Sequence, residues 1–240
     1  MYKKLVEALM RSAKNFVLIG EAGSGKTETA LNLALRMAEA EAGPVHFFDM
    51  DQTKPLFRAR DAAGMEAGGG ITFHFQPQYL DAPTVVPGVI ERLMDEDSRV
   101  LLDVGGGPYG AHMIGQFSHI LNRGNTRVLY LVNPYRPWSG RAEDIAVTMA
   151  RVTGAARLRR PELVANPNLG PDTTAEEVVA GMERFRRMFP DDRAVFLCAL
   201  EELCPELEGR VPEPVFPIRL NTLPDWLRDT LGNEDKSQDP

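Results

Sequence analysis

A glycine-rich stretch near the N-terminus combines the residue types that hold phosphate groups. Residues 20–29 read GEAGSGKTET and fit the pattern G-x-x-x-x-G-K-[ST] at Gly20, Gly25, Lys26 and Thr27. Glycines let backbone N–H groups converge on phosphate oxygens at the N-terminus of a helix, where the helix dipole also favours negative charge. The lysine of this pattern reaches β- and γ-phosphates, and the hydroxyl after it completes a Mg²⁺ coordination sphere. The spacing therefore predicts a site for a nucleotide with Mg²⁺.

The flanking residues support this interpretation. The apolar run FVLIG before the loop predicts a strand, and TALNLALRMAEA after it has the apolar spacing of a helix. A glycine-rich helix entry with an exposed lysine is the alternative, and it does not require this pairing of strand, loop and helix. We expect the loop and the first helical turn to contact the nucleotide through Gly20, Glu21, Ala22, Gly23, Ser24, Gly25, Lys26, Thr27 and Glu28.

Acidic residues at the ends of two later strands are the next candidates. Asp103 ends the run RVLLDV, and with Gly106 it fits D-x-x-G, a turn whose glycine N–H can sense a γ-phosphate. Asp49 and Asp51 end an earlier strand and could bind Mg²⁺ through water or position the attacking water. Ordinary turns and solvent-facing acids are the alternatives. We predict that Lys26 and these three acids are catalytic.

The predicted metal ligands are oxygen donors from three different segments, as Mg²⁺ prefers. They are Thr27, Asp51 and Asp103.

Two asparagines and a nearby basic and aromatic pair follow the later strands. Asn133 and Asn166 each end a predicted strand, where an amide can donate to and accept from a purine edge, although Asn-Pro is also a good turn opener. We predict a base contact for Asn166. Arg136 and Trp138 could line the same rim, the guanidinium toward phosphate and the indole toward a base or the core.

Short apolar runs separated by helical patterns predict the fold. Strands are expected at 16–20, 45–49, 71–75, 99–104, 127–133, 162–166 and 194–200, and helices at 26–40, 84–95, 109–122, 139–152 and 174–188. This alternation predicts an α/β fold of three layers, a mostly parallel sheet of about seven strands flanked by helices. The carboxyl ends of the strands should then form the ligand crevice.

Length and composition predict one domain. The chain has 240 residues, of which 43% are hydrophobic, so a single nucleotide-binding domain is expected over residues 1–231. The acidic end, 232–240, is expected to be disordered. The loop over 50–70, which contains Lys54, Arg58 and Arg60, has no strong period and is expected to be functional or mobile.

Charge and cysteine usage restrict the compartment and the partners. A net charge of −7 argues against a nucleic-acid surface. No apolar run approaches the roughly 20 residues of a membrane span, and the N-terminus lacks the apolar core of a signal peptide. Cys198 and Cys204 match neither a zinc site nor a disulfide framework, so reduced thiols are expected. These features predict a cytoplasmic protein with no nucleic-acid partner and no stable membrane anchor.

Taken together, these motifs resemble one group of phosphate-loop (P-loop) NTPases. The loop GEAGSGKT, the acids in FFDMD, the turn LLDVGGG and the asparagine in LVANPNLG lie in the order of the MinD/ParA/CobQ group, within the SIMIBI class that also holds signal-recognition GTPases and the nitrogenase iron protein. The resemblance covers residues 16–170. It implies a seven-stranded domain that binds ATP or GTP with Mg²⁺ and forms nucleotide-dependent dimers or docks a partner protein.

The resemblance also assigns roles by position. It implies that Asp49 or Asp51 is the first switch acid, that Asp103 with Gly106 forms the second switch, and that Asn166 contacts the base. The pattern departs at Glu21, because the loop of MinD- and ParA-like members begins GKGG and its lysine crosses a dimer interface. Glutamate would repel a facing phosphate, so a homodimer stays open.

Three functions from different classes fit these residues. The first is a Mg-dependent ATPase that acts as a switch or chaperone for a protein partner. The second is a metabolic enzyme of the CobQ/CobB or kinase type that transfers phosphoryl or adenylyl groups, with His112 and His119 beside an acceptor. The third is a scaffold that binds nucleotide without catalysis. ATP is favoured over GTP because the chain lacks an N-K-x-D guanine signature.

Overall fold

The structure, a computed structural model, describes residues 2–40, 43–51, 70–75 and 86–221. In these residues eight strands form one parallel sheet, in the order β3-β2-β4-β1-β5-β6-β7-β8. The strands are β1 (Asn15–Gly20), β2 (Val45–Asp49), β3 (Ile71–His74), β4 (Arg99–Asp103), β5 (Thr126–Val132), β6 (Glu162–Ala165), β7 (Leu197–Leu200) and β8 (Val215–Ile218).

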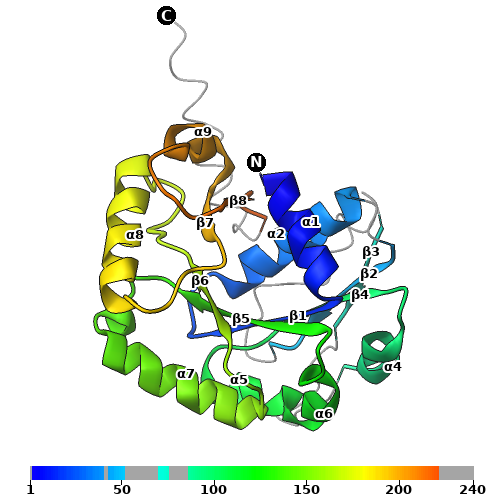
Figure 1. Cartoon of the computed structure of the whole chain (residues 1–240). Helices are drawn as coiled ribbons and strands as arrows, with labels where there is room; N and C mark the ends of the chain where they lie inside the picture. Colours follow the sequence, from blue (N-terminus) through cyan, green and yellow to red (C-terminus); the bar gives the residue numbers. More distant parts are fainter. Residues whose placement is uncertain (1, 41–42, 52–69, 76–85, 222–240) are drawn as a thin grey trace, which may run out of the picture.

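Helices cover both faces of the sheet (Figure 1). They are α1 (Tyr2–Ser12), α2 (Lys26–Glu39), α4 (Val89–Met94), α5 (Gly107–His112), α6 (Ser118–Leu121), α7 (Ala142–Ala156), α8 (Ala175–Met188) and α9 (Cys204–Leu207), with short 3-10 turns η1 (Met113–Phe117), η2 (Pro137–Ser139) and η3 (Glu201–Leu203). One apolar core lies between the sheet and helices α1 and α2. The other lies between the sheet and the helices from α4 through α9. The predicted three-layer α/β fold is confirmed.

The strand prediction is confirmed at all seven predicted positions, and the structure adds an eighth strand. This strand, β8, reads VFPI and contains Pro217. Proline cannot donate to a strand ladder, so a proline in the sequence weakens any strand pattern. β8 lies at the edge of the sheet and pairs only with β7, and an edge strand tolerates the missing N–H.

The helix predictions need three corrections. The single helix expected over 109–122 is α5, η1 and α6 in sequence, because Gly110 and Gly115 lower the helix propensity of this stretch. The helix expected over 84–95 begins only at Val89, after Gly88 in a left-handed conformation. The sequence interpretation also missed α1, whose buried face contributes Val6 and Leu9 to the core beside α2.

The strand order places the crevice where β1 ends. β1 lies between β4 and β5. After β1 the chain continues to β2, toward one edge of the sheet, whereas after β4 it crosses to β5, toward the other edge. In open parallel sheets such a switch point opens a crevice beyond the carboxyl ends of the strands. The expected tail over 232–240 and most of the loop over 50–70, with Lys54, Arg58 and Arg60, lie outside the described residues. None of the described helices has the length and apolar composition needed to cross a bilayer.

Candidate nucleotide-binding site

The glycine-rich loop connects β1 to α2 at this switch point, as the sequence pattern predicts. Gly25 has φ 94°, and a Cβ at this residue would lie 2.1 Å from Nδ2 of Asn166, so only glycine fits here. The Lys26 side chain is buried, and its Nζ donates to the Glu21 carbonyl at 2.9 Å. The lysine therefore folds back along the loop, and its ammonium lies among the backbone groups that would surround a phosphate.

Asn166 holds the loop from the end of β6. Its Nδ2 donates to the Ser24 carbonyl at 2.7 Å, and its backbone N–H donates to the Val132 carbonyl at 2.8 Å. The side chain is 8% exposed, so this contact is nearly dry. Asn166 thus braces the loop, which the sequence interpretation did not anticipate, and its base contact stays a prediction.

Asn133 has a structural position. It is 2% exposed, its Nδ2 donates to the Asn168 carbonyl at 2.8 Å, and its Oδ1 accepts from the Tyr135 backbone N–H at 3.0 Å. The amide therefore joins the loops after β5 and β6. Of the two interpretations of Asn133, turn chemistry is the one that its contacts support.

The predicted acids meet at one edge of the sheet. Asp49 and Asp103 are paired residues of the neighbouring strands β2 and β4, and Asp103 is itself paired with Leu18 of β1. The Asp49 carboxylate accepts from the Asp51 backbone N–H at 2.9 Å. Asp51 points toward the turn after β4, because its Oδ1 would lie 3.1 Å from a Cβ placed on Gly105. The three acids thus lie together at the carboxyl ends of β2 and β4, and β4 is the neighbour of β1 in the sheet.

The donors at this edge fit Mg²⁺. Asp103 is 1% exposed, so a carboxylate is buried beside the loop that the pattern assigns to phosphate. Mg²⁺ is commonly held by one or two carboxylates together with substrate phosphates and water, and a hydroxyl at Thr27 would complete that set. Among the residues that the structure describes, no group of three or more His, Cys, Asp or Glu side chains forms a metal cluster. Substrate oxygens would therefore have to supply the remaining ligands.

The turn after β4 touches the glycine-rich loop directly. A Cβ on Gly106 would lie 2.9 Å from the backbone N and Cα of Ala22. Real Cβ atoms do not approach a backbone this closely, so a residue with a side chain would push the turn and the loop apart. The predicted second switch, Asp103 with Gly106, therefore lies against the loop.

Glu21 turns to the side of the loop that faces β5. Together with Ser24, Tyr130 and Trp138 it lines a cavity of about 10 Å³, roughly the size that one water needs. Burial, and then the charge of Glu21, raise the pKa of Tyr130 above its usual value. The Glu21 carboxylate also lies near the turn after β4, because its Oε2 would be 3.9 Å from a Cβ placed on Gly107.

The loop after β5 covers the tip of the glycine-rich loop. Arg136 Nε donates to the Gly23 carbonyl at 3.0 Å, and Trp138 Cζ2 would lie 3.7 Å from a Cβ on Gly23. The sequence places both residues at a strand end, and the structure shows that both reach the loop. No pattern within the loop itself could have identified these neighbours.

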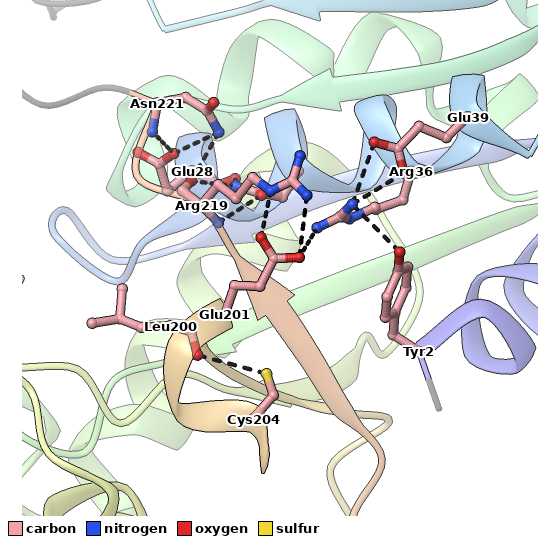
Figure 2. Close-up of polar contacts among 10 residues, drawn as sticks. Tyr2, Glu28, Arg36, Glu39, Leu200, Glu201, Cys204, Arg219 and Asn221 are labelled. Carbon is pink, nitrogen blue, oxygen red and sulfur yellow. Dashed lines mark hydrogen bonds and ion pairs between the residues drawn. The ribbon is translucent and has the colours of Figure 1, made fainter. Parts of the chain in front are cut away.

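One face of α2 carries polar residues that bind the chain just beyond β8. Asn32 is 1% exposed, and its amide donates to the Arg219 carbonyl and accepts from the Arg219 N–H, both at 2.9 Å. One turn earlier, the Glu28 carboxylate accepts from the backbone and side-chain N–H groups of Asn221 (Figure 2). The first two turns of the helix that begins at Lys26 are therefore fastened to the chain beyond β8.

One turn further along α2, Arg36 continues this polar face (Figure 2). Arg36 Nη2 donates to Glu201 at 2.7 Å and Nη1 donates to Glu39 at 3.0 Å, while its guanidinium lies 4.7 Å from the centre of the Tyr2 ring. Glu201 also binds Arg219, which closes a network between α1, α2, η3 and the end of β8. Arg219 first, and then Arg36, lower the pKa of Glu201.

The remaining candidates of the sequence lie away from the loop. His112 and His119 are exposed, and His119 contacts the Gln116 carbonyl of its own helical turn at 3.2 Å. Cys198 and Cys204 are free thiols, as predicted. Burial raises the pKa of Cys198 to about 12, although a hydrogen bond to Thr29 opposes this shift.

Comparisons with known proteins gave matches of low sequence identity among solved structures. No family model matches the chain, and no curated protein matches it. FlhF complexed with GMPPNP and Mg²⁺ is 16% identical, with a TM-score of 0.42 over 68% of this chain and 64% of that one. The cell division protein FtsY of Thermotoga maritima is 14% identical, with a TM-score of 0.49 over 90% and 73%. A nucleotide-binding protein of Archaeoglobus fulgidus in complex with ADP is 14% identical, with a TM-score of 0.47 over 99% and 94%.

Proposed function

We propose that this chain is a Mg-dependent nucleotide-binding protein, a P-loop NTPase of the SIMIBI class that acts as a switch or chaperone for a protein partner. One observation carries the proposal. The loop with the G-x-x-x-x-G-K-T pattern lies between β1 and α2 at the switch point of the sheet, directly beside the buried Asp103. Backbone N–H groups, a lysine and a strand-end acid at one crevice are the parts that phosphoryl chemistry uses.

The proposed reaction is hydrolysis of a nucleoside triphosphate. Water adds to the γ-phosphorus, and the bond from that phosphorus to the β–γ bridging oxygen breaks. The nucleoside diphosphate leaves with the electron pair of that bond. Lys26 would bind the β- and γ-phosphates, and Asp49 or Asp51 would orient the water. Thr27, Asp51 and Asp103 would hold Mg²⁺, which neutralises phosphate charge when it is bound. The products are the nucleoside diphosphate, inorganic phosphate and one proton.

The switch function rests on the turn after β4. Gly106 packs against Ala22 of the loop, so a γ-phosphate in the loop would press on this turn or pull on it. Tyr109, which is 92% exposed, lies on α5 just beyond the turn. A displacement of the turn would therefore move an aromatic side chain on the protein surface, and this supports a partner that senses the nucleotide. ATP remains our preferred nucleotide because the sequence has no guanine signature.

Calorimetric titration with Mg·ATP, and separately with Mg·GTP, tests the proposal. We expect one-to-one binding of at least one nucleotide, and a loss of about 100-fold or more in affinity in Lys26→Ala, because the substitution leaves the phosphate charge without its lysine. Lys3→Ala removes an exposed lysine of α1 and serves as the matched control. Wild-type affinity in Lys26→Ala would contradict the proposal. Phosphate release measured on the same samples then distinguishes an NTPase from a scaffold that only binds.

A further inference from the structure

The turn after β5 brings a cationic side chain over the tip of the glycine-rich loop. Arg136 is exposed, and its Nε donates to the Gly23 carbonyl at 3.0 Å. A Cβ placed on Gly23 would lie 3.5 Å from that Nε and 3.6 Å from Cζ, so the guanidinium covers this residue. Trp138 lies on the same side of the tip. The arginine and the tryptophan therefore form one wall beside the place that the loop offers to phosphates.

The backbone of this turn is held firmly. The Arg136 N–H donates to the Asn133 carbonyl at 3.2 Å, and the Ser139 N–H donates to the Arg136 carbonyl at 2.9 Å. Asn133 is anchored in turn to the loop after β6. The held backbone fixes the point from which the Arg136 side chain extends, so only side-chain conformational entropy is lost when the charge meets its ligand.

The guanidinium has donors left for a ligand. Arginine carries five N–H donors, and the contact to Gly23 uses the one on Nε. Toward the described part of the chain, the Nη groups of Arg136 form neither a hydrogen bond nor an ion pair. A phosphate oxygen accepts a stronger and often bidentate bond from arginine than a neutral carbonyl does. A triphosphate in the loop would therefore draw the guanidinium from the carbonyl to itself.

A bound triphosphate would bring negative charge to the loop, and cations beside the loop would stabilise it. Among the residues that the structure describes, Lys26 and Arg136 donate to backbone carbonyls of the loop, those of Glu21 and Gly23. Position 21, where MinD- and ParA-like loops carry a lysine, holds a glutamate. Arg136 thus brings a further cation to the loop, from the turn after β5.

We propose that Arg136 is a catalytic residue, an arginine supplied by the same chain that contacts the γ-phosphate over Gly23. The assignment rests on the proposed NTPase function and identifies a residue that acts in it. Negative charge moves to the phosphoryl and bridging oxygens while the bond to the bridging oxygen breaks and the water oxygen adds. The guanidinium, once it has moved from the Gly23 carbonyl to the γ-phosphate, stabilises that charge more in the transition state than in the ground state. The hydrolysing unit would then need no residue from a second copy.

Arg136→Ala and Arg136→Lys test the assignment, with Arg141→Ala as the matched control. Arg141 lies five residues further along, and its side chain is 74% exposed and paired with Asp144. We expect Arg136→Ala to bind Mg·ADP or Mg·GDP with an affinity within about threefold of wild type. The variant should lose the gain in diphosphate affinity that aluminium fluoride gives the wild type, and it should hydrolyse triphosphate at least about tenfold more slowly. The hydrolysis rate of Arg136→Lys should lie between those of wild type and Arg136→Ala. Added guanidinium should partly restore the hydrolysis rate of Arg136→Ala.

The outcomes separate this assignment from the proposed function. Wild-type hydrolysis and wild-type tightening by aluminium fluoride in Arg136→Ala would overturn it. Equal losses of diphosphate and triphosphate affinity with an unchanged rate would also overturn it, because they would show a brace for the loop only. A wild-type protein that gains no affinity from aluminium fluoride overturns it too. If Lys26→Ala abolishes binding in each of these cases, the nucleotide-binding function still stands.

Discussion

At the scale of single residues, Asn166 connects the end of β6 to the glycine-rich loop. Its amide donates to the Ser24 carbonyl, and its side chain occupies the space that a Cβ on Gly25 would need. The predicted base contact would use the same side chain, so one amide would serve both the loop and the ligand. If the base contact is made, substitution of Asn166 would remove a contact to the loop and a contact to the ligand together.

We expect Asn166→Ala to weaken nucleotide binding about tenfold, because it removes a buried hydrogen bond to the loop and the predicted base contact. Calorimetry with the nucleotide that binds wild type measures this effect. Asn168→Ala is the control, since Asn133 uses only the backbone carbonyl of Asn168. An affinity unchanged in Asn166→Ala, or weakened equally in both variants, would show that the amide has no special role.

At the scale of elements, the position of α2 depends on the chain beyond β8. Asn32 binds both backbone groups of Arg219, while Glu28 binds Asn221 (Figure 2). Because α2 begins at Lys26, these contacts act on the same turns that carry the lysine and the hydroxyl toward the ligand. The chain at the end of the edge strand β8 therefore supports the helix of the proposed nucleotide site, although β8 lies far from β1 in the sheet.

Asn32→Ala should lower the free energy of unfolding by about 2 kcal/mol, because it removes two hydrogen bonds of a buried amide and leaves the Arg219 N–H without that partner, while the Arg219 carbonyl still accepts from the Asn221 side chain. Urea unfolding followed by circular dichroism measures the change. Asn122→Ala is a matched control, because Asn122 makes the same two-way contact to Arg157 and Arg159 at an exposed site. The control should lose about 1 kcal/mol or less, and equal losses in the two variants would refute the argument from burial.

At the scale of the whole molecule, a buried histidine pair makes stability depend on pH. His46 on β2 is 6% exposed, and its Nδ1 lies 2.9 Å from Nε2 of His74 on β3. Burial, then the charges of Arg92 and His74, lower the pKa of His46 to about 4, while Asp95 opposes the shift. The folded protein thus keeps this imidazole neutral at pH values where an unfolded chain would protonate it.

The free energy of unfolding should therefore fall as the pH drops from about 6.5 to about 4, because only the unfolded state takes up this proton over that range. The upper limit for the loss is about 3 kcal/mol, reached below pH 4 where both states are protonated. Urea unfolding between pH 7 and pH 4 measures it. His46→Gln should flatten this part of the profile and the exposed His119→Gln should not. A profile unchanged by His46→Gln would contradict the assignment.

The sequence alone determined the parts whose geometry is local. Eight consecutive residues, Gly20 to Thr27, specify the loop by their own backbone freedom and chemistry, and the strand before it and the helix after it follow from the spacing of apolar residues. The position of Asp103 also followed, since a residue at the end of a parallel strand must lie at the carboxyl edge of the sheet. The assignment of these residues to catalysis and metal binding remains a prediction until the variants are measured.

The tertiary structure decided which distant residues support the loop. Arg136 meets Gly23 across 113 residues of sequence, Asn166 meets Ser24 across 142, and Asn32 meets Arg219 across 187. These contacts depend on the order of strands in the sheet, and no periodicity or spacing within one segment encodes that order. The edge strand β8 was missed for a related reason, because only its place beside β7 makes its proline acceptable.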